Sequence, residues 1–250
     1  MKRIILYLFL ITVFTQGCSK TKRLDRLWFY TYSSGDAKNE AMEATPASFL
    51  CLKPDGSYTR DFGKFDYGSW KLEKSALVLH SNTNQVIIFP IKNFFNNELQ
   101  LVSAKQTVLN FESQPNKFSS ASDDPFSMEN NQWRVPPTNK ETDIQIKDRL
   151  RNHCRFNEVY FKWALDNELN SIDVRSTPSP IKIYANGFAL KEFDDLPATW
   201  RSYFFDEEDC RKANNMIKNI FEKGLIGWVH TDNRYKMFMS AFQQLQEQLK

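Results

Sequence analysis

Residues 50–58 read LCLKPDGSY, and this stretch predicts how the first half of the chain folds. Apolar residues precede Pro54-Asp55-Gly56, and Tyr58 follows it. Proline presets the backbone angle φ that a turn requires, and glycine accepts a positive φ. The stretch therefore predicts two antiparallel strands joined by a tight hairpin turn.

Short alternating segments separated by turn residues continue on both sides of this hairpin. Many short strands at close spacing are typical of a β-sandwich or β-barrel. We predict an antiparallel meander or barrel over 24–114. Its expected strands lie near Leu27 and Trp28 and at 49–53, 57–62, 65–73, 76–81, 85–91, 98–103 and 107–112.

Two motifs in this region resemble those of lipocalin-like domains in bacterial lipoproteins. The first is the 50–58 stretch, and the second is Gly68-Ser69-Trp70-Lys71-Leu72 followed by Leu77-Val78-Leu79. Leu27-Trp28 resembles the opening aromatic of such domains. The resemblance covers about 90 residues and implies a barrel with one apolar interior.

Alternation with a period of two residues indicates which side chains face that interior. A barrel of about eight strands is either filled by its own side chains or holds one small ligand. The inward set is thus either the wall of an apolar ligand cavity or a packed core. The side chains that we expect to face a ligand are Trp28, Leu50, Leu52, Tyr58, Trp70, Leu72, Leu79 and Phe89.

The first 17 residues have the pattern of a signal peptide. Lys2 and Arg3 precede an apolar run from Ile4 to Phe14. A membrane-spanning helix needs roughly 20 apolar residues, so the run is too short to span. A short apolar run behind a basic start is typical of an export signal that is cleaved.

Cys18, directly after Gly17, resembles the acylated cysteine of bacterial lipoproteins. The resemblance implies that 1–17 is removed, that Cys18 carries acyl chains such as palmitate, and that 18–23 is a tether. Several acyl chains anchor a protein stably to a membrane, where a single chain is marginal. In the Bacteroidota-type lipoproteins that this start resembles, an acidic stretch after the cysteine is associated with display on the cell surface. No acidic stretch follows Cys18, so the resemblance implies an outer membrane lipoprotein of the cell envelope that faces the periplasm. A soluble secreted protein and an uncleaved anchor are the alternatives.

The second half of the chain has a different pattern. Residues 115–135 are rich in Ser, Asn, Asp and Pro and predict a linker. We predict a mixed α+β domain over 136–250, with three helices and a short β-hairpin sheet, so the fold class is α+β. Thr138 and Glu141 have the spacing of a capping box for a helix that runs to about residue 167. The other expected elements are strands at 171–175, 181–185 and 188–193, a helix from 206 to 223, and a helix from about 233.

Several residues of the second half are candidates for chemistry. His153 and Asn157 lie one helical turn apart on an apolar face, where they form either part of a site or a buried hydrogen-bonded brace. His230 and Asp232 have the residue types of a base and its orienting partner. The acidic run 206–209 suits either the positive start of a helix or a cation. Cys51, Cys154 and Cys210 allow at most one internal disulfide, with Cys154–Cys210 as the candidate pair, or they are three buried apolar side chains.

The motifs H-E-x-x-H, G-x-S-x-G, C-x-x-C, the P-loop and G-x-G-x-x-G do not occur in this sequence. We therefore expect no enzyme activity, no cofactor and no metal site. The net charge is +3, and Lys2 and Arg3 contribute two of the positive charges, so a nucleic-acid partner is disfavoured. The sequence predicts a membrane-anchored binding protein for a small apolar ligand or an envelope protein partner. A structural component of an envelope assembly is the alternative, and an enzyme of unrecognised type is the third.

Overall fold

The computed structural model describes residues 24–34, 48–114, 118, 120–169, 179–184, 187–227 and 233–250. The predicted signal peptide, Cys18 and the tether lie outside these ranges. The chain divides into two compact units, a barrel and a helical unit that comprises residues 117–250 together with residues 63–65. None of the helices in the described ranges has the length and apolar character needed to cross a membrane.

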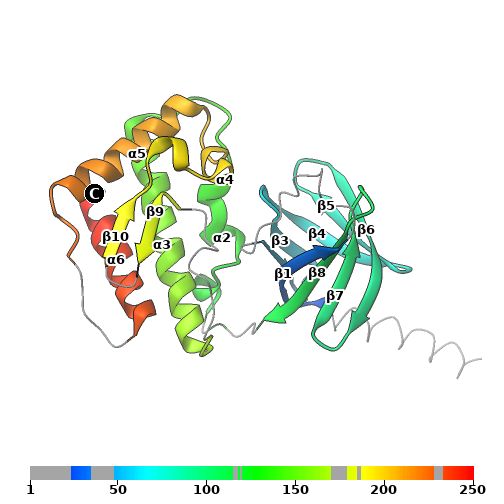
Figure 1. Cartoon of the computed structure of the whole chain (residues 1–250). Helices are drawn as coiled ribbons and strands as arrows, with labels where there is room; N and C mark the ends of the chain where they lie inside the picture. Colours follow the sequence, from blue (N-terminus) through cyan, green and yellow to red (C-terminus); the bar gives the residue numbers. More distant parts are fainter. Residues whose placement is uncertain are drawn as a thin grey trace, which may run out of the picture. The chain divides into compact units, whose positions relative to one another are not determined.

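The first unit is a closed barrel of eight antiparallel strands that follow one another in chain order (Figure 1). β1 closes the barrel by pairing with β8. An eight-stranded barrel followed by helices is consistent with a lipocalin-like fold. The strands are β1 (Leu27–Ser34), β2 (Phe49–Leu52), β3 (Ser57–Asp61), β4 (Phe65–Glu73), β5 (Ala76–Ser81), β6 (Val86–Phe95), β7 (Glu98–Val102) and β8 (Val108–Gln114).

The predicted hairpin between β2 and β3 is confirmed. The Gly56 N–H donates to the Lys53 carbonyl at 3.1 Å, and Gly56 has a φ of 83°. The Ser57 N–H donates to the Asp55 carboxylate at 2.8 Å. Glycine and aspartate thus provide the backbone freedom and the local acceptor that this turn requires.

The second unit is built around one long helix, α3 (Asp143–Asp166). α6 (Arg234–Gln248) lies beside it, with Phe161 of α3 packed on Phe238 and Phe242 of α6 (Figure 1). The other elements are η2 (Ala121–Asp123), α2 (Met128–Asn131), η3 (Gln132–Arg134), β9 (Ile181–Tyr184), β10 (Gly187–Leu190), η5 (Phe193–Asp195), α4 (Ala198–Arg201) and α5 (Glu207–Glu222). The fold class is therefore α+β, a barrel followed by a helical region.

α3 begins about one turn later than the Thr138–Glu141 spacing predicts. Its N-cap is Thr142, whose hydroxyl accepts from the Gln145 N–H at 3.3 Å, and the Gln145 side chain accepts from the Thr142 N–H at 2.8 Å. Glu141 instead accepts from Arg149. The sequence contains two capping patterns, Thr138–Glu141 and Thr142–Gln145. Only the second forms a capping box, and Glu141 of the first forms an ion pair with Arg149 instead.

The composition predicts that residues 115–135 form an irregular linker, but part of this stretch is buried and forms short helices. Phe126 and Trp133 within it are almost fully buried. Asn130 donates to the Asp124 carbonyl at 2.8 Å, and Asn131 donates to the Pro125 carbonyl at 2.7 Å. Short polar side chains favour loops because they bond the backbone locally, and here the same bonds hold short helices in place.

Three further expectations concern the second unit. β9 and β10 pair antiparallel as two strands, whereas the expected strand 171–175 lies outside the described residues. α5 follows the N-cap Asp206 and ends before Gly224, which has a φ of 64°. Cys154 and Cys210 are both buried thiols, so the disulfide considered for them does not form.

Candidate functional site

The barrel interior brings together all eight side chains that the sequence predicts to face a ligand. Seven of them are at most 7% exposed, and Leu72 is partly buried against the others. They come from six different strands, so they meet only because the barrel closes. The seven are Trp28, Leu50, Leu52, Tyr58, Trp70, Leu79 and Phe89.

Aromatic rings that the sequence analysis did not select share this interior. The Phe62 ring lies 5.5 Å from that of Phe111 and 6.1 Å from that of Phe89, measured between centroids. Tyr30 lies edge-on to Phe111 at 5.9 Å. Edge-to-face and offset contacts at these distances are favourable, and they give the interior an aromatic surface.

The two tryptophans have their indole N–H groups satisfied near the end of the barrel where the β2–β3 turn lies. Trp28 Nε1 donates to the Leu24 carbonyl at 3.0 Å. Trp70 Nε1 donates to the Lys53 carbonyl at 2.9 Å. Each indole therefore presents its apolar rings to the interior while its polar atom is bound to backbone.

A polar network lies at the opposite end of the interior and centres on Asp66. The Tyr58 hydroxyl donates to Asp66 Oδ2 at 2.6 Å, and Arg60 Nε donates to the same oxygen at 3.0 Å. The Ser81 hydroxyl donates to Asp66 Oδ1 at 2.6 Å. The Arg60 guanidinium also lies 5.3 Å from the centre of the Phe62 ring. We call these four polar residues the Asp66 network.

The position of each member along its strand explains why the network faces inward. Arg60 of β3 lies two residues from Tyr58 and two from Phe62, which directly follows the strand, and both of these residues belong to the core. Asp66 shares the parity of Trp70 on β4, and Ser81 that of Leu79 on β5. Because side chains alternate along a strand, the three polar side chains point into the barrel. That parity is the signal that could have identified them from the sequence.

The electrostatics of the network favour an ionised carboxylate beside a neutral phenol. Burial acts to raise the pKa of Asp66, but the hydrogen bonds from Ser81 and Tyr58 and the charge of Arg60 outweigh it and lower that pKa. Burial, together with the bond to Asp66, raises the pKa of Tyr58 well above its usual range. At neutral pH the network therefore holds one positive and one negative charge, which are partly buried and compensate each other.

The second unit places His153 and Asn157 in its core. Asn157 Nδ2 donates to the His153 carbonyl at 2.8 Å, and the His153 ring lies 4.6 Å from Trp133 and 4.8 Å from Trp200, measured between centroids. Burial, with a contribution from Arg134, lowers the pKa of His153 to about 3. A neutral, enclosed imidazole fits a brace better than a proton-transfer group at neutral pH. His230 and Asp232 lie outside the described residues.

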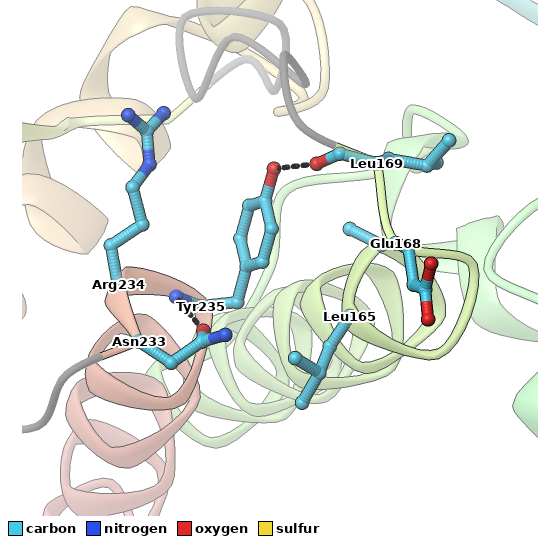
Figure 2. A pocket seen from close by; sticks show the side chains of 7 residues that line it. Leu165, Glu168, Leu169, Asn233, Arg234 and Tyr235 are labelled. Carbon is cyan, nitrogen blue, oxygen red and sulfur yellow. Dashed lines mark hydrogen bonds between the residues drawn. The ribbon is translucent and has the colours of Figure 1, made fainter.

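A surface pocket of about 450 Å³ lies where α3 ends and α6 begins (Figure 2). The Tyr235 hydroxyl donates to the Leu169 carbonyl there, and Asn233 Oδ1 accepts from the Tyr235 N–H at 2.9 Å. Arg234 and Glu168 are exposed at its rim. Its central polar atoms already bond one another.

Groups of three or more metal-binding side chains do not occur within the described ranges. The acidic start of α5 is explained locally, because Asp206 Oδ1 accepts from the Asp209 N–H at 2.9 Å and Asp209 accepts from the Glu141 N–H at 2.9 Å. Helix starts favour such carboxylates. Comparison of the chain with family models, with curated proteins and with solved structures finds no match.

Proposed function

We propose that this chain is an envelope lipoprotein, anchored through acyl chains on Cys18, whose barrel binds a small molecule with an apolar body and a polar head. The barrel with its buried aromatic core fits a binding role in general. The observation that supports the finer proposal is the Asp66 network at one end of an otherwise apolar interior.

The chemistry of the interior defines the ligand class. Ligand sites are largely apolar, with a few polar groups that fix orientation. The core cluster would contact the apolar body, and the Nη groups of Arg60, whose Nε bonds Asp66, would donate to a polar head such as a carboxylate. The aromatic rings of Phe62 and Phe111 belong to this cluster, with Phe62 beside Arg60, and suit a flat or chain-like hydrocarbon.

A fluorescence titration with 11-(dansylamino)undecanoate tests this role. This probe has an apolar chain and a carboxylate, and we expect saturable binding to lipid-extracted protein. Arg60→Gln should raise the dissociation constant by about 10–150-fold, because a charge-assisted hydrogen bond contributes about 1.5–3 kcal/mol. Lys64→Gln is the matched control, since Lys64 is an exposed cation in the turn between β3 and β4. Equal affinities of the two variants would refute the head-group contact.

The anchor has a separate test. Cys18→Ser should abolish acylation, so the mature protein should lose the mass of its acyl chains and leave the membrane fraction. Unchanged mass, processing and membrane partitioning would exclude the anchor, while the binding role of the barrel would remain open to the titration.

An envelope protein partner is a second candidate, supported by the outer surface of β6. Val86 and Ile88 are 56% and 57% exposed and share one face of that strand. Exposed contiguous apolar surface is typical of interaction sites. Ile88→Lys should abolish co-purification of such a partner from native membranes, whereas Lys92→Ala should retain it.

A further inference from the structure

A groove lies in the second unit between α5 and the segment that follows β10. Its volume is about 340 Å³, within the range of small-ligand sites. One wall is formed by residues 190–193, and the other by side chains of α5 that include Asn214, Lys218 and Phe221. We call this the α5 groove.

The wall opposite α5 is held rigidly. The Arg211 guanidinium lies 3.7 Å from the centre of the Phe193 ring, and that of Arg201 lies 4.9 Å from it. Arg201 Nη2 also donates to the carbonyls of Phe193 and Asp194 at 2.8 and 2.9 Å. Arg211 is itself fixed by Glu207, which accepts from Nη2 at 2.6 Å. The groove is therefore formed before any ligand arrives, which reduces the entropy lost on binding.

Asn214 provides an acceptor that the described part of the chain leaves without a donor. Its side chain lines the groove, yet the residue is only 5% exposed. Its Oδ1 is buried and accepts no hydrogen bond from any described residue. Buried polar atoms are nearly always paired, so this oxygen is an acceptor open to a donor other than the described residues.

The backbone at the edge of the groove is arranged to pair with an extended chain. The Lys191 N–H donates to the Pro180 carbonyl at 2.7 Å, which continues the register that pairs Leu190 with Ile181. Hydrogen-bonded and non-bonded pairs alternate in antiparallel strands. The Leu190 N–H and carbonyl therefore point away from β9, and among the described strands none pairs with that edge of β10.

The groove favours a neutral peptide group over a charged ligand. Lys218 and Glu222 at its rim form an ion pair at 3.8 Å, and Lys191 and Glu192 add one charge of each sign. Leu190, Phe193 and Phe221 supply apolar wall. The site thus combines an acceptor for an N–H, an edge of β10 with which no described strand pairs, and an apolar surface for a side chain.

We propose that the α5 groove binds an extended peptide segment of another polypeptide, with a backbone N–H of that segment donating to Asn214 Oδ1. An apolar side chain of the segment lies against Phe193 and Phe221, and its backbone extends along the edge of β10 at Leu190. Main-chain pairing gives affinity in this mode of recognition, and side-chain pockets give specificity. The proposal is independent of the barrel and of the anchor.

Saturation-transfer NMR with N-acetyl-L-leucine N-methylamide as the observed ligand tests the proposal on the full chain. The probe has two peptide groups and one apolar side chain. We expect saturable transfer in the wild type and a dissociation constant at least tenfold higher in Asn214→Leu. Asn219→Leu, an exposed position of α5 outside the groove, should stay within twofold of the wild type. The same probe methylated on both amide nitrogens should lose binding, because it has no N–H to donate.

A measurement of folding stability distinguishes whether Asn214 serves a ligand or braces the fold. An unpaired buried oxygen contributes nothing to the folded state, so Asn214→Leu should unfold at the same denaturant concentration as the wild type or at a higher one. A lower midpoint would show that Asn214 braces the fold and would overturn the proposal. Absence of saturable transfer, unchanged affinity in Asn214→Leu, or equal binding of the methylated probe would each overturn it as well. Asn214→Ala provides a second variant with the same expected loss of binding.

Discussion

The Tyr58 hydroxyl donates a 2.6 Å hydrogen bond to the Asp66 carboxylate, and this bond joins β3 to β4 inside the barrel. The neutral phenol and the ionised carboxylate stabilise each other's protonation state, because the pKa of Tyr58 is raised and that of Asp66 is lowered. Arg60 supplies the compensating charge. The barrel therefore contains a charged network that stays intact at neutral pH.

Asp66→Asn tests how far this network stabilises the fold. The variant leaves Arg60 without its counter-charge, so we expect the free energy of unfolding at pH 7 to fall by about 2–4 kcal/mol. Because the folded-state pKa of Asp66 is below the unfolded value of about 3.9, its contribution is present above pH 4 and is lost as the pH falls through the folded pKa. Urea unfolding between pH 7 and pH 3 measures both effects. If the difference in unfolding free energy between wild type and variant stayed constant over this range, the lowered pKa of Asp66 would be contradicted. Glu112→Gln, at an exposed position of β8, serves as the control.

The sequence predicted the strands of the barrel well, because their signals are local. Pro54-Asp55-Gly56 fixes one turn, and alternation marks the inward positions of β4 and β5. The Asp66 network was missed because its members converge only when the strands pair in register. Arg60 shows how far a sequence-based prediction reaches. Its inward position can be predicted from the alternation, but its partner Asp66 lies six residues away on another strand, so their contact cannot be predicted.

In the second unit, the helix starts could be predicted from local sequence signals, whereas the buried core could not. The starts of α5 and α6 can be predicted from the sequence, because their N-cap residues are Asp206 and Asn233. Burial of Trp133 was not readable, because its surroundings are polar and resemble a linker. The aromatic contacts of His153 likewise come from three different segments of the chain.

Gly68 provides a prediction about the Gly-x-Trp motif. A Cβ atom at this position would lie 2.0 Å from the His80 carbonyl oxygen on β5, far closer than van der Waals contact allows. Gly68→Ala should therefore lower the free energy of unfolding by about 3 kcal/mol or prevent closure of the barrel. Gly224→Ala is the matched control, because its φ of 64° is unfavourable for alanine but its surroundings are open, so about 1 kcal/mol is expected. Chemical denaturation measures the loss of unfolding free energy in each variant. Equal losses would show that the close approach of the His80 carbonyl is not the reason for glycine at position 68.

Leu79 tests whether the inward residues form one tightly packed core. Its side chain is fully buried, and its strand neighbours Trp70 and Ile87 both contact the core. Leu79→Ala should lower the free energy of unfolding by about 2–5 kcal/mol through lost burial and the cavity that remains. Val86→Ala, on the exposed face of β6, should change it by less than about 0.5 kcal/mol. A loss below 1 kcal/mol at Leu79, measured by denaturant unfolding, would indicate a loosely packed interior.

His153 makes the second unit sensitive to acid in a way that can be separated from the barrel. Burial lowers its folded-state pKa to about 3, whereas the unfolded chain binds a proton below about 6.5. The neutral imidazole therefore contributes fully above pH 6.5, and its contribution is lost as the pH falls from 6.5 towards 3, at about 1.4 kcal/mol per pH unit. In His153→Leu this dependence should disappear, so the stability difference between wild type and variant should change with pH over that interval. NMR titration of the His153 ring gives a direct measurement, and an apparent pKa near 6.5 in the folded protein would show that the imidazole is accessible to water rather than enclosed by Trp133 and Trp200.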